Sequence, residues 1–405
     1  MHWPYKQHKT SRNQKITPYH EELKAAGACF GVSGGFERPM WFNLNGSPPE
    51  YKYSYGYQNW YPSVEKETKN TKKNVGLFDL TPFSKFDLKG EGSFDELQRI
   101  CTANIKSING KTTYTQILNK DGGIEIDCTV VCLEKNYFRI ISSAATRERD
   151  KFFILNNISK DIIFEDVTDK YCCLGVFGPK SRDLLSKISQ DNFSNENFKF
   201  GTGKFVKIND MKVWAQRLSY VGEIGFELYI ETLHAKQLYK AIVEEGNNHN
   251  LTHCGMHAMD TMRMENGFLH WGHDISPEEN QYQAGLDFAI SYKKNVDFLG
   301  KDALLKIKDK KIEKKMIMLT LKDKKPGDPL LLHDEPIYLD DRIIGRTTSG
   351  NYSFNFNKNL TFGYVNRDFN NLDTSKHKIY VEVGKVKYEA EYLPKVLNQN
   401  NYKTI

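Results

Sequence analysis

Hydrophobic and polar residues alternate along residues 119–131, NKDGGIEIDCTVV, which open with a turn signal at Asn119–Gly123. A period of two is typical of a β-strand that buries one face. The pattern places Ile124, Ile126, Cys128 and Val130 on one face and Glu125, Asp127 and Thr129 on the other. Taken alone, it favours a strand with one buried and one solvated face, and it gives Asp127 no special role.

Similar patterns predict short strands and helices in mixed order over the rest of the chain. We expect strand-like alternation at 75–90 and a helix at 93–105, capped by Ser93 with Glu96 completing a capping box. Residues 171–188 predict a strand, a Gly-Pro turn and a helix. Further strands are expected at 137–145, 211–220 and 226–230, and further helices at 146–158, at 234–250 and within 253–275. No βαβ rhythm is present, so the order indicates an α+β fold.

The two ends of the chain differ from its middle. Residues 37–42 and 51–62 form a dense aromatic cluster, typical either of single-stranded nucleic-acid stacking or of an arm that packs on the protein body. Burial of aromatic side chains is the commoner use, so we favour the arm. The basic run 306–315 is interpreted as a helix end and linker, and the strands and turn signals of 314–405 predict a small β-barrel.

Composition narrows the class of protein. A chain of 405 residues predicts two or three domains, and its net charge of +6 is spread among interspersed charges. This argues against a nucleic-acid partner and suits an anionic small molecule. The seven cysteines include no Cys-x-x-Cys, so neither a disulfide framework nor a zinc ribbon is expected. Without a signal peptide or a membrane-length apolar run, we expect a cytoplasmic protein without membrane contact, the mitochondrial matrix being the alternative.

No motif specifies a mechanism by itself. The chain contains no Walker loop, no Gly-x-Gly-x-x-Gly after a strand and no nucleophile elbow. Tyr220 and Glu227 flank a Gly-bearing hairpin and fit ordinary surface positions. His270, His273 and Asp274 do not have the spacing of a metal motif, so no metal is expected.

The segment 253–275 predicts a helix that ends at Gly267. Asp260 and Arg263 lie three residues apart and are expected to pair. Met259 and Met262 have core spacing. The residues alone therefore give acids and aromatics without a mechanism.

Six motifs resemble, in order, the folate-binding T-protein of the glycine cleavage system: VGLFDLTPFSKF, YTQILNKDGGIEIDCTVV, VFGPKSRDLL, SYVGEIGFELYI, FLGKDALLK and GRTTSGNYS. This similarity covers about residues 70–370. The chain is more similar still to the tetrahydrofolate-binding C-terminal half of dimethylglycine and sarcosine dehydrogenases. That half has near variants of HWP-KQ, GACFG, ERP-WF, YSYG-QNW and LHWGHDI, so the match covers nearly the whole chain. Those enzymes usually carry an N-terminal flavin domain, and the chain resembles their folate half as a free-standing protein.

The resemblance implies a set of site residues. The T-protein family has a catalytic aspartate as the second acid of a Gly-Gly-Ile-x-Asp-Asp run, which corresponds to Asp127, and Ile126 replaces the first acid. The polar strand face would then line a ligand cavity. The folate-contacting positions correspond to Tyr114, Tyr220, Glu227, Phe268 and Trp271, with Thr129 lining the same cavity. Met259 stands where the T-protein has an arginine, which argues against an aminomethyl-lipoyl substrate.

The resemblance also implies a three-domain, ring-like α+β fold with a C-terminal β-barrel. The expected domains are an aromatic-rich arm that begins the folate-binding body (1–75), two folate-binding α+β domains with an interleaved boundary near 170–210 (76–313), and the barrel (314–405).

The implied activity is tetrahydrofolate-dependent one-carbon transfer. An iminium or formaldehyde unit from an N-methyl amine would become 5,10-methylene-tetrahydrofolate, with a separate flavoprotein oxidoreductase as the partner that oxidises the amine. Two alternatives stay open. One is direct methyl transfer to tetrahydrofolate from a sulfonium or quaternary amine, and the other is a non-catalytic folate-binding subunit of a flavoprotein complex.

Overall fold

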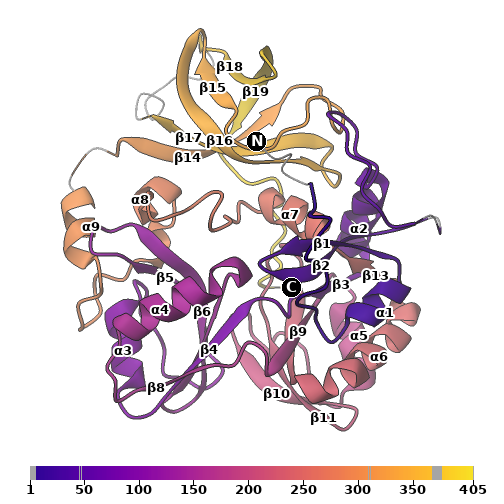
Figure 1. Ribbon diagram of the computed structural model, residues 1–405. Coiled ribbons are helices and arrows are strands. Elements are labelled where there is room, and N and C mark those ends of the chain that lie inside the picture. The colour runs from indigo at the N-terminus through magenta and orange to yellow at the C-terminus, as the bar shows by residue number, and fades with distance from the viewer. Residues whose placement is uncertain are drawn as a thin grey trace.

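The structure is a computed structural model that describes residues 6–44, 46, 48–308, 310, 312–366 and 376–404. Two α+β bodies and a C-terminal β-barrel are arranged in a ring (Figure 1). This confirms the predicted three-domain, ring-like α+β fold with its barrel. The residue limits of the three domains stay a prediction, and the His2-Trp3-Pro4 motif lies outside the described residues.

One body is built on a six-stranded sheet with the strand order β10-β11-β12-β9-β3-β13. Its helices α1, α5 and α6 bury Leu23, Leu184 and Leu238 in a core against one face of the sheet. The strands are β3 (Val75–Asp79), β9 (Tyr171–Phe177), β10 (Gly203–Ile208), β11 (Met211–Gln216), β12 (Gly225–Glu231) and β13 (Leu251–Cys254). The helices are α1 (His20–Ala25), α5 (Ser181–Ile188) and α6 (Ala235–Gly246).

The other α+β body has a five-stranded sheet with the order β5-β6-β7-β4-β8, and its chain is inserted between β3 and β9. Its strands are β4 (Ser84–Lys89), β5 (Thr112–Leu118), β6 (Ile124–Glu134), β7 (Tyr137–Ser142) and β8 (Ile163–Asp166). Helices α3 (Ser93–Ile100) and α4 (Arg147–Asn156) cover one face through Leu97 and Ile154. The other face is left for the six-stranded body.

The capping box predicted at Ser93 is wrong. Gly92 has a left-handed backbone (φ 85°) and turns the chain straight into α3, so Ser93 is the first helical residue. Its hydroxyl is buried with no hydrogen-bond partner in the described part of the chain. The helix also ends earlier than predicted, because Cys101 is extended and bridges to Ile117.

The aromatic-rich N-terminal segment contains strands β1 (Ala28–Ser33) and β2 (Phe36–Phe42) and helix α2 (Tyr61–Lys73). Trp41 and Trp60 are buried in a core shared with Phe78 of β3. The prediction that this segment packs its aromatics on the body is therefore confirmed for both tryptophans. Between them, Tyr55 and Tyr57 stay 86% and 55% exposed.

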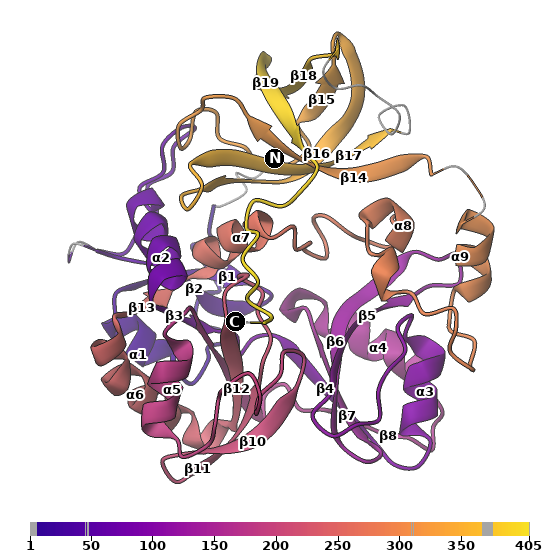
Figure 2. The ribbon, with the colours of Figure 1, turned by 180° about the vertical axis from the view of Figure 1, so that it is seen from behind.

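The barrel closes in the order β14-β17-β16-β15-β18-β19. Its strands are β14 (Lys314–Leu321), β15 (Pro336–Leu339), β16 (Arg342–Ser353), β17 (Lys358–Asn366), β18 (Ile379–Val383) and β19 (Val386–Leu393). Helices α7 (Met256–Glu265), α8 (Gln281–Ala284) and α9 (Lys301–Lys308) lie between the six-stranded body and the barrel in the sequence. Beyond the barrel, the chain runs back past α7 to the six-stranded body (Figure 2). There the Asn398 backbone amide donates to Glu265 O of α7 at 2.9 Å, and its side-chain amide donates to Gly222 O, between β11 and β12, at 3.0 Å.

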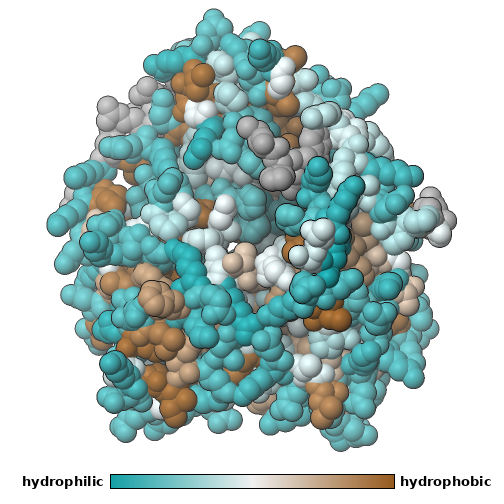
Figure 3. Space-filling model, in the orientation of Figure 1, coloured by the Kyte–Doolittle hydropathy of each residue, from teal (hydrophilic) through white to brown (hydrophobic). Residues whose placement is uncertain are grey.

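The face of the molecule seen in Figure 3 is largely hydrophilic, with hydrophobic residues gathered toward the side where α4 and β8 lie. Phe152, Leu155 and Ile163 are exposed hydrophobic residues of these two elements. Within the described ranges, no helix is both long enough and apolar enough to cross a membrane.

Candidate functional site

The two faces of β6 meet different surroundings. Ile126 and Val130 are buried in the core that α3 and α4 cover, so the position where the related run has its first acid suits an apolar side chain. On the opposite face, Val131 and Leu133 pack in one core with residues of the six-stranded sheet. Asp127 and Thr129 share that face by strand alternation, so they point toward the neighbouring body.

Asp127 is held by a neighbouring strand. Gln116, directly opposite on β5, donates from Nε2 to Asp127 Oδ1 at 2.7 Å. Burial raises the pKa of Asp127 to about 6, while hydrogen bonding from Gln116 and Tyr114 opposes the rise. A carboxyl group with this pKa can both accept and release a proton near neutral pH, which suits a general acid or base.

Tyr114 lies beside Asp127 and opposite Thr129. Burial, followed by the charge of Asp127, raises the pKa of Tyr114, so its hydroxyl stays protonated as a donor. Its ring stacks on Phe288 with centroids 6.2 Å apart and an interplanar angle of 22°. Phe288 itself is 73% exposed, so the stacked pair forms one edge of the site.

A second stacked pair comes from the six-stranded body. Tyr220 stacks on Phe268 at 5.9 Å and 18°, and its hydroxyl donates to Leu269 O at 2.9 Å. Burial raises the pKa of Tyr220, and the charges that act on it include Arg263 and Asp127. Tyr220 is therefore close enough to Asp127 to interact with it electrostatically across the two bodies.

Trp271 contacts the start of the strand that carries Asp127. Its indole Nε1 donates to Ile124 O at 3.1 Å, and the guanidinium of Arg149 lies 4.7 Å from its ring centroid. These contacts fix the loop after α7 against β6. The geometry gives Trp271 a supporting contact, and a direct contact with folate stays a prediction.

Glu227 lies on β12, with its carboxylate accepting from Tyr229 Oη at 2.6 Å. Burial raises the pKa of Glu227, and the charge of Lys85 partly offsets this. Gln216 is directly opposite on β11, and its Oε1 accepts from the indole of Trp214 at 3.3 Å. The other amide atom, Gln216 Nε2, is buried without a hydrogen-bond partner among the described residues.

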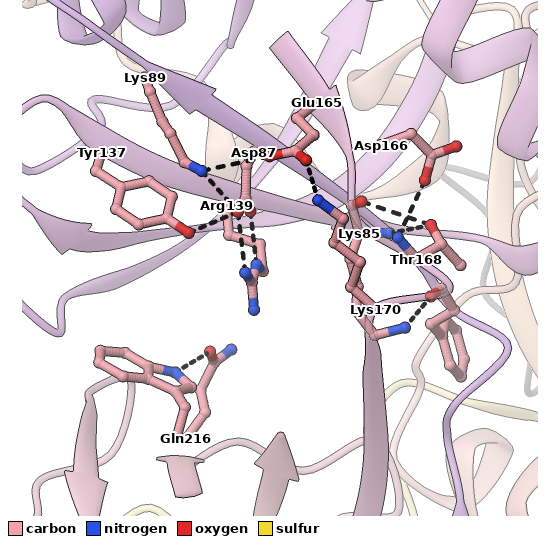
Figure 4. Close-up of polar contacts among 12 residues, drawn as sticks. Lys85, Asp87, Lys89, Tyr137, Arg139, Glu165, Asp166, Thr168, Lys170 and Gln216 are labelled. Atoms are coloured by element: carbon pink, nitrogen blue, oxygen red, sulfur yellow. Dashed lines mark hydrogen bonds and ion pairs between the residues drawn. The ribbon is translucent and has the colours of Figure 1, made fainter. Parts of the chain in front are cut away.

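The five-stranded sheet presents ionic side chains to this region (Figure 4). Arg139 Nε donates to Asp87 Oδ1 at 2.7 Å, and Tyr137 Oη donates to Asp87 Oδ2 at 2.6 Å. Lys85 is fully buried, donates to the carbonyls of Thr81 and Phe83, and has its pKa lowered to about 8 by burial. Asp87 is thus paired with Arg139 and Tyr137, and the ammonium group of Lys85 places positive charge near Glu227.

The structure thus brings most of the sequence-predicted residues to the region where the two bodies meet. Asp127, Tyr114 and Thr129 are neighbours on one sheet, and Tyr220 with Phe268 approaches from the other body. No hydrogen bond in the described part of the chain joins Glu227 to Asp127. Sequence reasoning missed Gln116, Gln216 and Phe288 in this region. It also missed Gln281, whose Nε2 donates to Gln116 Oε1 at 2.5 Å.

The segment after α7 that carries His270 is held by an acidic residue. Asp274 Oδ2 accepts from the His270 backbone amide at 2.9 Å, and burial lowers the pKa of His270 to about 4. Arg263 Nε donates to Asp260 Oδ1 at 2.9 Å, which confirms the predicted pair. Among residues with a described position, no group of three or more His, Cys, Asp or Glu is arranged to hold a metal ion.

Two family models match the chain. The GCVT N-terminal domain matches residues 19–294, and the glycine cleavage T-protein C-terminal barrel domain matches residues 314–398. The fold is similar to the crystal structure of glycine cleavage system aminomethyltransferase T from Bartonella henselae, with a TM-score of 0.80 and 21% identity. That likeness covers 95% of this chain and 97% of the other.

Three relatives illustrate the range of similar proteins. The 4-methylaminobutanoate oxidase (formaldehyde-forming) of Paenarthrobacter nicotinovorans is 40% identical over 87% of this chain and 42% of its own length. Mitochondrial dimethylglycine dehydrogenase of Rattus norvegicus is 34% identical over 87% of this chain and 41% of its own length. Aminomethyltransferase of Oceanobacillus iheyensis is 30% identical over 94% of this chain and 97% of its own length. The chain therefore spans less than half of the first two proteins and nearly all of the third.

Proposed function

We propose that the chain, which belongs to the glycine cleavage T-protein family of aminomethyltransferases, is a tetrahydrofolate-dependent one-carbon transferase. Its reaction converts an iminium or formaldehyde unit derived from an N-methyl amine to 5,10-methylene-tetrahydrofolate. The observation that carries the proposal is the position of Asp127, a carboxyl group with a pKa of about 6 between two bodies that both contribute stacked aromatics. The relative whose name specifies formaldehyde formation supports this choice of one-carbon unit.

The residues present fit a reduced folate. Glu227 would accept hydrogen bonds from the donor edge of the pterin, and the unpartnered Gln216 Nε2 opposite it is a donor suited to the neighbouring pterin oxygen. Tyr114 and Tyr220 offer stacked rings for a flat ligand. Bound tetrahydrofolate would supply the nitrogen atoms that take up the one-carbon unit.

Asp127 is the group of this chain that handles the proton. Its ionised carboxylate would stabilise positive charge on the iminium unit and accept a proton released during transfer. Gln116 holds the Oδ1 atom of this carboxylate at 2.7 Å and so would fix its orientation toward the reacting atoms. The facing sheets would exclude water and keep a reactive formaldehyde unit from escaping.

Product identity tests this function. Purified protein is incubated with tetrahydrofolate and one of three donors: an N-methyl amine together with an added flavoprotein amine oxidase, a sulfonium or quaternary ammonium compound, or formaldehyde. The folate product is resolved by mass spectrometry. Enzyme-dependent 5,10-methylene-tetrahydrofolate supports the proposal, measured against a no-enzyme control because formaldehyde condenses spontaneously. Formation of 5-methyl-tetrahydrofolate would establish direct methyl transfer instead. Binding without turnover would leave a folate-binding subunit.

Glu227→Ala is expected to weaken tetrahydrofolate binding by roughly 1.5–3 kcal/mol, the range for a hydrogen bond to a charged group. The reason is that the pterin donor edge would lose its carboxylate partner. Isothermal titration calorimetry measures the change. Glu231→Ala, at the exposed end of the same strand, is the matched control and should bind as the wild type does. Equal affinities for the two variants would place the pterin elsewhere.

A separate flavoprotein oxidoreductase is the partner we propose for amine oxidation. The names of the two longer relatives are those of an oxidase and a dehydrogenase, and this chain spans 42% and 41% of them. The exposed Tyr55 and Tyr57 are suited to a protein contact because tyrosine is enriched at interfaces. An added amine oxidase supplies the oxidised one-carbon unit as its flavin is reduced. The rate of folate product formation coupled to this reduction should fall when both tyrosines are changed to serine. If the substitutions leave this coupled rate unchanged, the segment that carries Tyr55 and Tyr57 is not part of the interface.

A further inference from the structure

A chain of buried amides lies directly behind Asp127. Gln281 Nε2 donates to Gln116 Oε1 at 2.5 Å, and Gln116 Nε2 donates to Asp127 Oδ1 at 2.7 Å. Gln281 Nε2 also donates to Thr102 Oγ1 at 3.1 Å. Gln116, Gln281 and Thr102 are all 0% exposed, so no water competes for these bonds.

Each hydrogen bond in this row of amides has a defined donor and acceptor. The Thr102 hydroxyl donates to Ala289 O at 3.1 Å, so its oxygen is left to accept from Gln281. Gln281 then presents N–H to Gln116 Oε1, which obliges Gln116 to turn its own N–H toward Asp127. If the Gln116 amide were rotated by 180°, its NH₂ group would face the NH₂ group of Gln281. Its oxygen would face the carboxylate of Asp127.

This arrangement of donors and acceptors leaves one buried amide oxygen without a hydrogen bond. Gln281 Oε1 is buried and has no hydrogen-bond partner in the described part of the chain. An unsatisfied buried acceptor is unfavourable for stability, and such violations concentrate at functional sites. The orientation of the Gln281 amide is therefore better explained by the hydrogen bonds that its Nε2 donates than by the hydrogen bonding of its own oxygen.

Gln281 reaches this place from a distant part of the sequence. It is the first residue of α8, whose capping box pairs Asn280 with Gln283. Just before it, Glu279 O accepts from the Ile124 amide at 2.9 Å, and the Glu279 carboxylate pairs with Lys314 of the barrel at 2.5 Å. The segment that carries Gln281 is thus fixed both to the strand of Asp127 and to the barrel.

We propose that Gln281 is a positioning residue for the one-carbon transfer, acting through Gln116 to keep an N–H donor on the catalytic carboxylate of Asp127. The role in catalysis rests on the proposed function. The positioning of Asp127 does not, because it follows from the hydrogen bonds alone. Through Glu279 and Lys314, the barrel helps to set the position of Gln281.

Gln281→Met keeps the length of the side chain and removes its donor. Gln116 is then free to rotate, so the ionised form of Asp127 loses support and the pKa of Asp127 rises. We expect the acid limb of the pH profile of kcat/KM to move up by about half to one unit, equivalent to a roughly 3–10-fold loss on that limb. Thr102→Val, which removes the acceptor that orients Gln281, should shift the limb in the same direction by less.

Direct titration of Asp127 by ¹³C NMR of labelled aspartate carboxyls, assigned with Asp127→Asn, reads the same change without an activity assay. Gln283→Glu is the matched control, because glutamate preserves the capping box of α8 and leaves the amide chain intact. It should leave both the titration and the pH profile as in the wild type.

The outcomes separate the two proposals. An upward shift of the Asp127 titration in Gln281→Met and Thr102→Val, absent in Gln283→Glu, supports the positioning role even if no folate product is ever found. An unchanged titration in folded Gln281→Met protein, or a loss of activity equal at all pH values, would overturn it. Absence of tetrahydrofolate turnover in the wild type would instead reject the proposed function.

Discussion

Asp127→Asn is expected to lower kcat for one-carbon transfer by about 10²-fold or more, the range for removing a general acid or base. The amide cannot accept the proton that the carboxylate takes, nor can it stabilise a cationic one-carbon unit with a full negative charge. The protein should stay folded, because asparagine has almost the same shape and its side-chain oxygen can still accept the hydrogen bond from Gln116 Nε2. Steady-state kinetics with the folate product resolved by mass spectrometry measures the effect.

The stability of the same variant provides an independent check. Burial raises the pKa of Asp127 to about 6 in the folded protein, above the usual value of an unfolded aspartate. A raised pKa means that ionisation destabilises the fold, so the contribution of Asp127 is fully present below about pH 4 and is lost as the pH rises through 6. Asp127→Asn should therefore be more stable than the wild type at pH 8, by roughly 1–2 kcal/mol. At pH 4 that advantage should be gone.

Asp121→Asn is the matched control, because Asp121 is exposed at the turn of the same hairpin. It should change neither kcat nor the pH dependence of unfolding. Near-wild-type turnover by Asp127→Asn would end the assignment of Asp127 as the catalytic group. A stability that rises equally in both variants would show that the effect is one of net charge.

The alternation along β6 could be predicted from the sequence, but what lies across from each face could not. Period two correctly separates Ile126 from Asp127, because adjacent residues of a strand point to opposite sides. The same rule could have found Gln116, which lies two residues from Tyr114 and shares its face. A polar face toward water and one toward another body have the same local pattern, so the resemblance was needed to choose between them.

Contacts between distant segments were beyond local reasoning. Gln281 meets Gln116 across 165 residues, and no spacing rule connects them. The run 75–90 was expected to alternate as a strand, yet the structure divides it into β3 and β4, which belong to different bodies. The predicted cap at Ser93 failed for a different reason: a left-handed glycine can start a helix without a side-chain cap, and local chemistry favoured the serine.

Arg263→Met is expected to destabilise the protein by roughly 3–5 kcal/mol, the cost of breaking a buried ion pair by removing one partner. Arg263 and Asp274 have 2% and 0% side-chain exposure, and Nη1 lies 2.6 Å from Asp274 Oδ2. The same guanidinium donates to Asp260 Oδ1 at 2.9 Å and to Ser349 Oγ of the barrel at 2.8 Å. Its loss leaves the Asp274 carboxylate buried without a cation and removes a link between α7 and β16.

Arg346→Met provides the comparison that tests this argument, because it also removes an arginine paired with an aspartate. Arg346 lies 3.0 Å from Asp334, but the two side chains are 66% and 58% exposed. Exposed ion pairs contribute about 0–1 kcal/mol, so this variant should unfold in urea nearly as the wild type does. Since the two substitutions remove the same kind of side chain, the difference between their free energies of unfolding measures the effect of burial. A cost for Arg263→Met as small as that for Arg346→Met would mean that Asp274 finds compensation within the barrel, where Thr348 and Ser349 already donate to its Oδ1 at 2.6 and 2.7 Å.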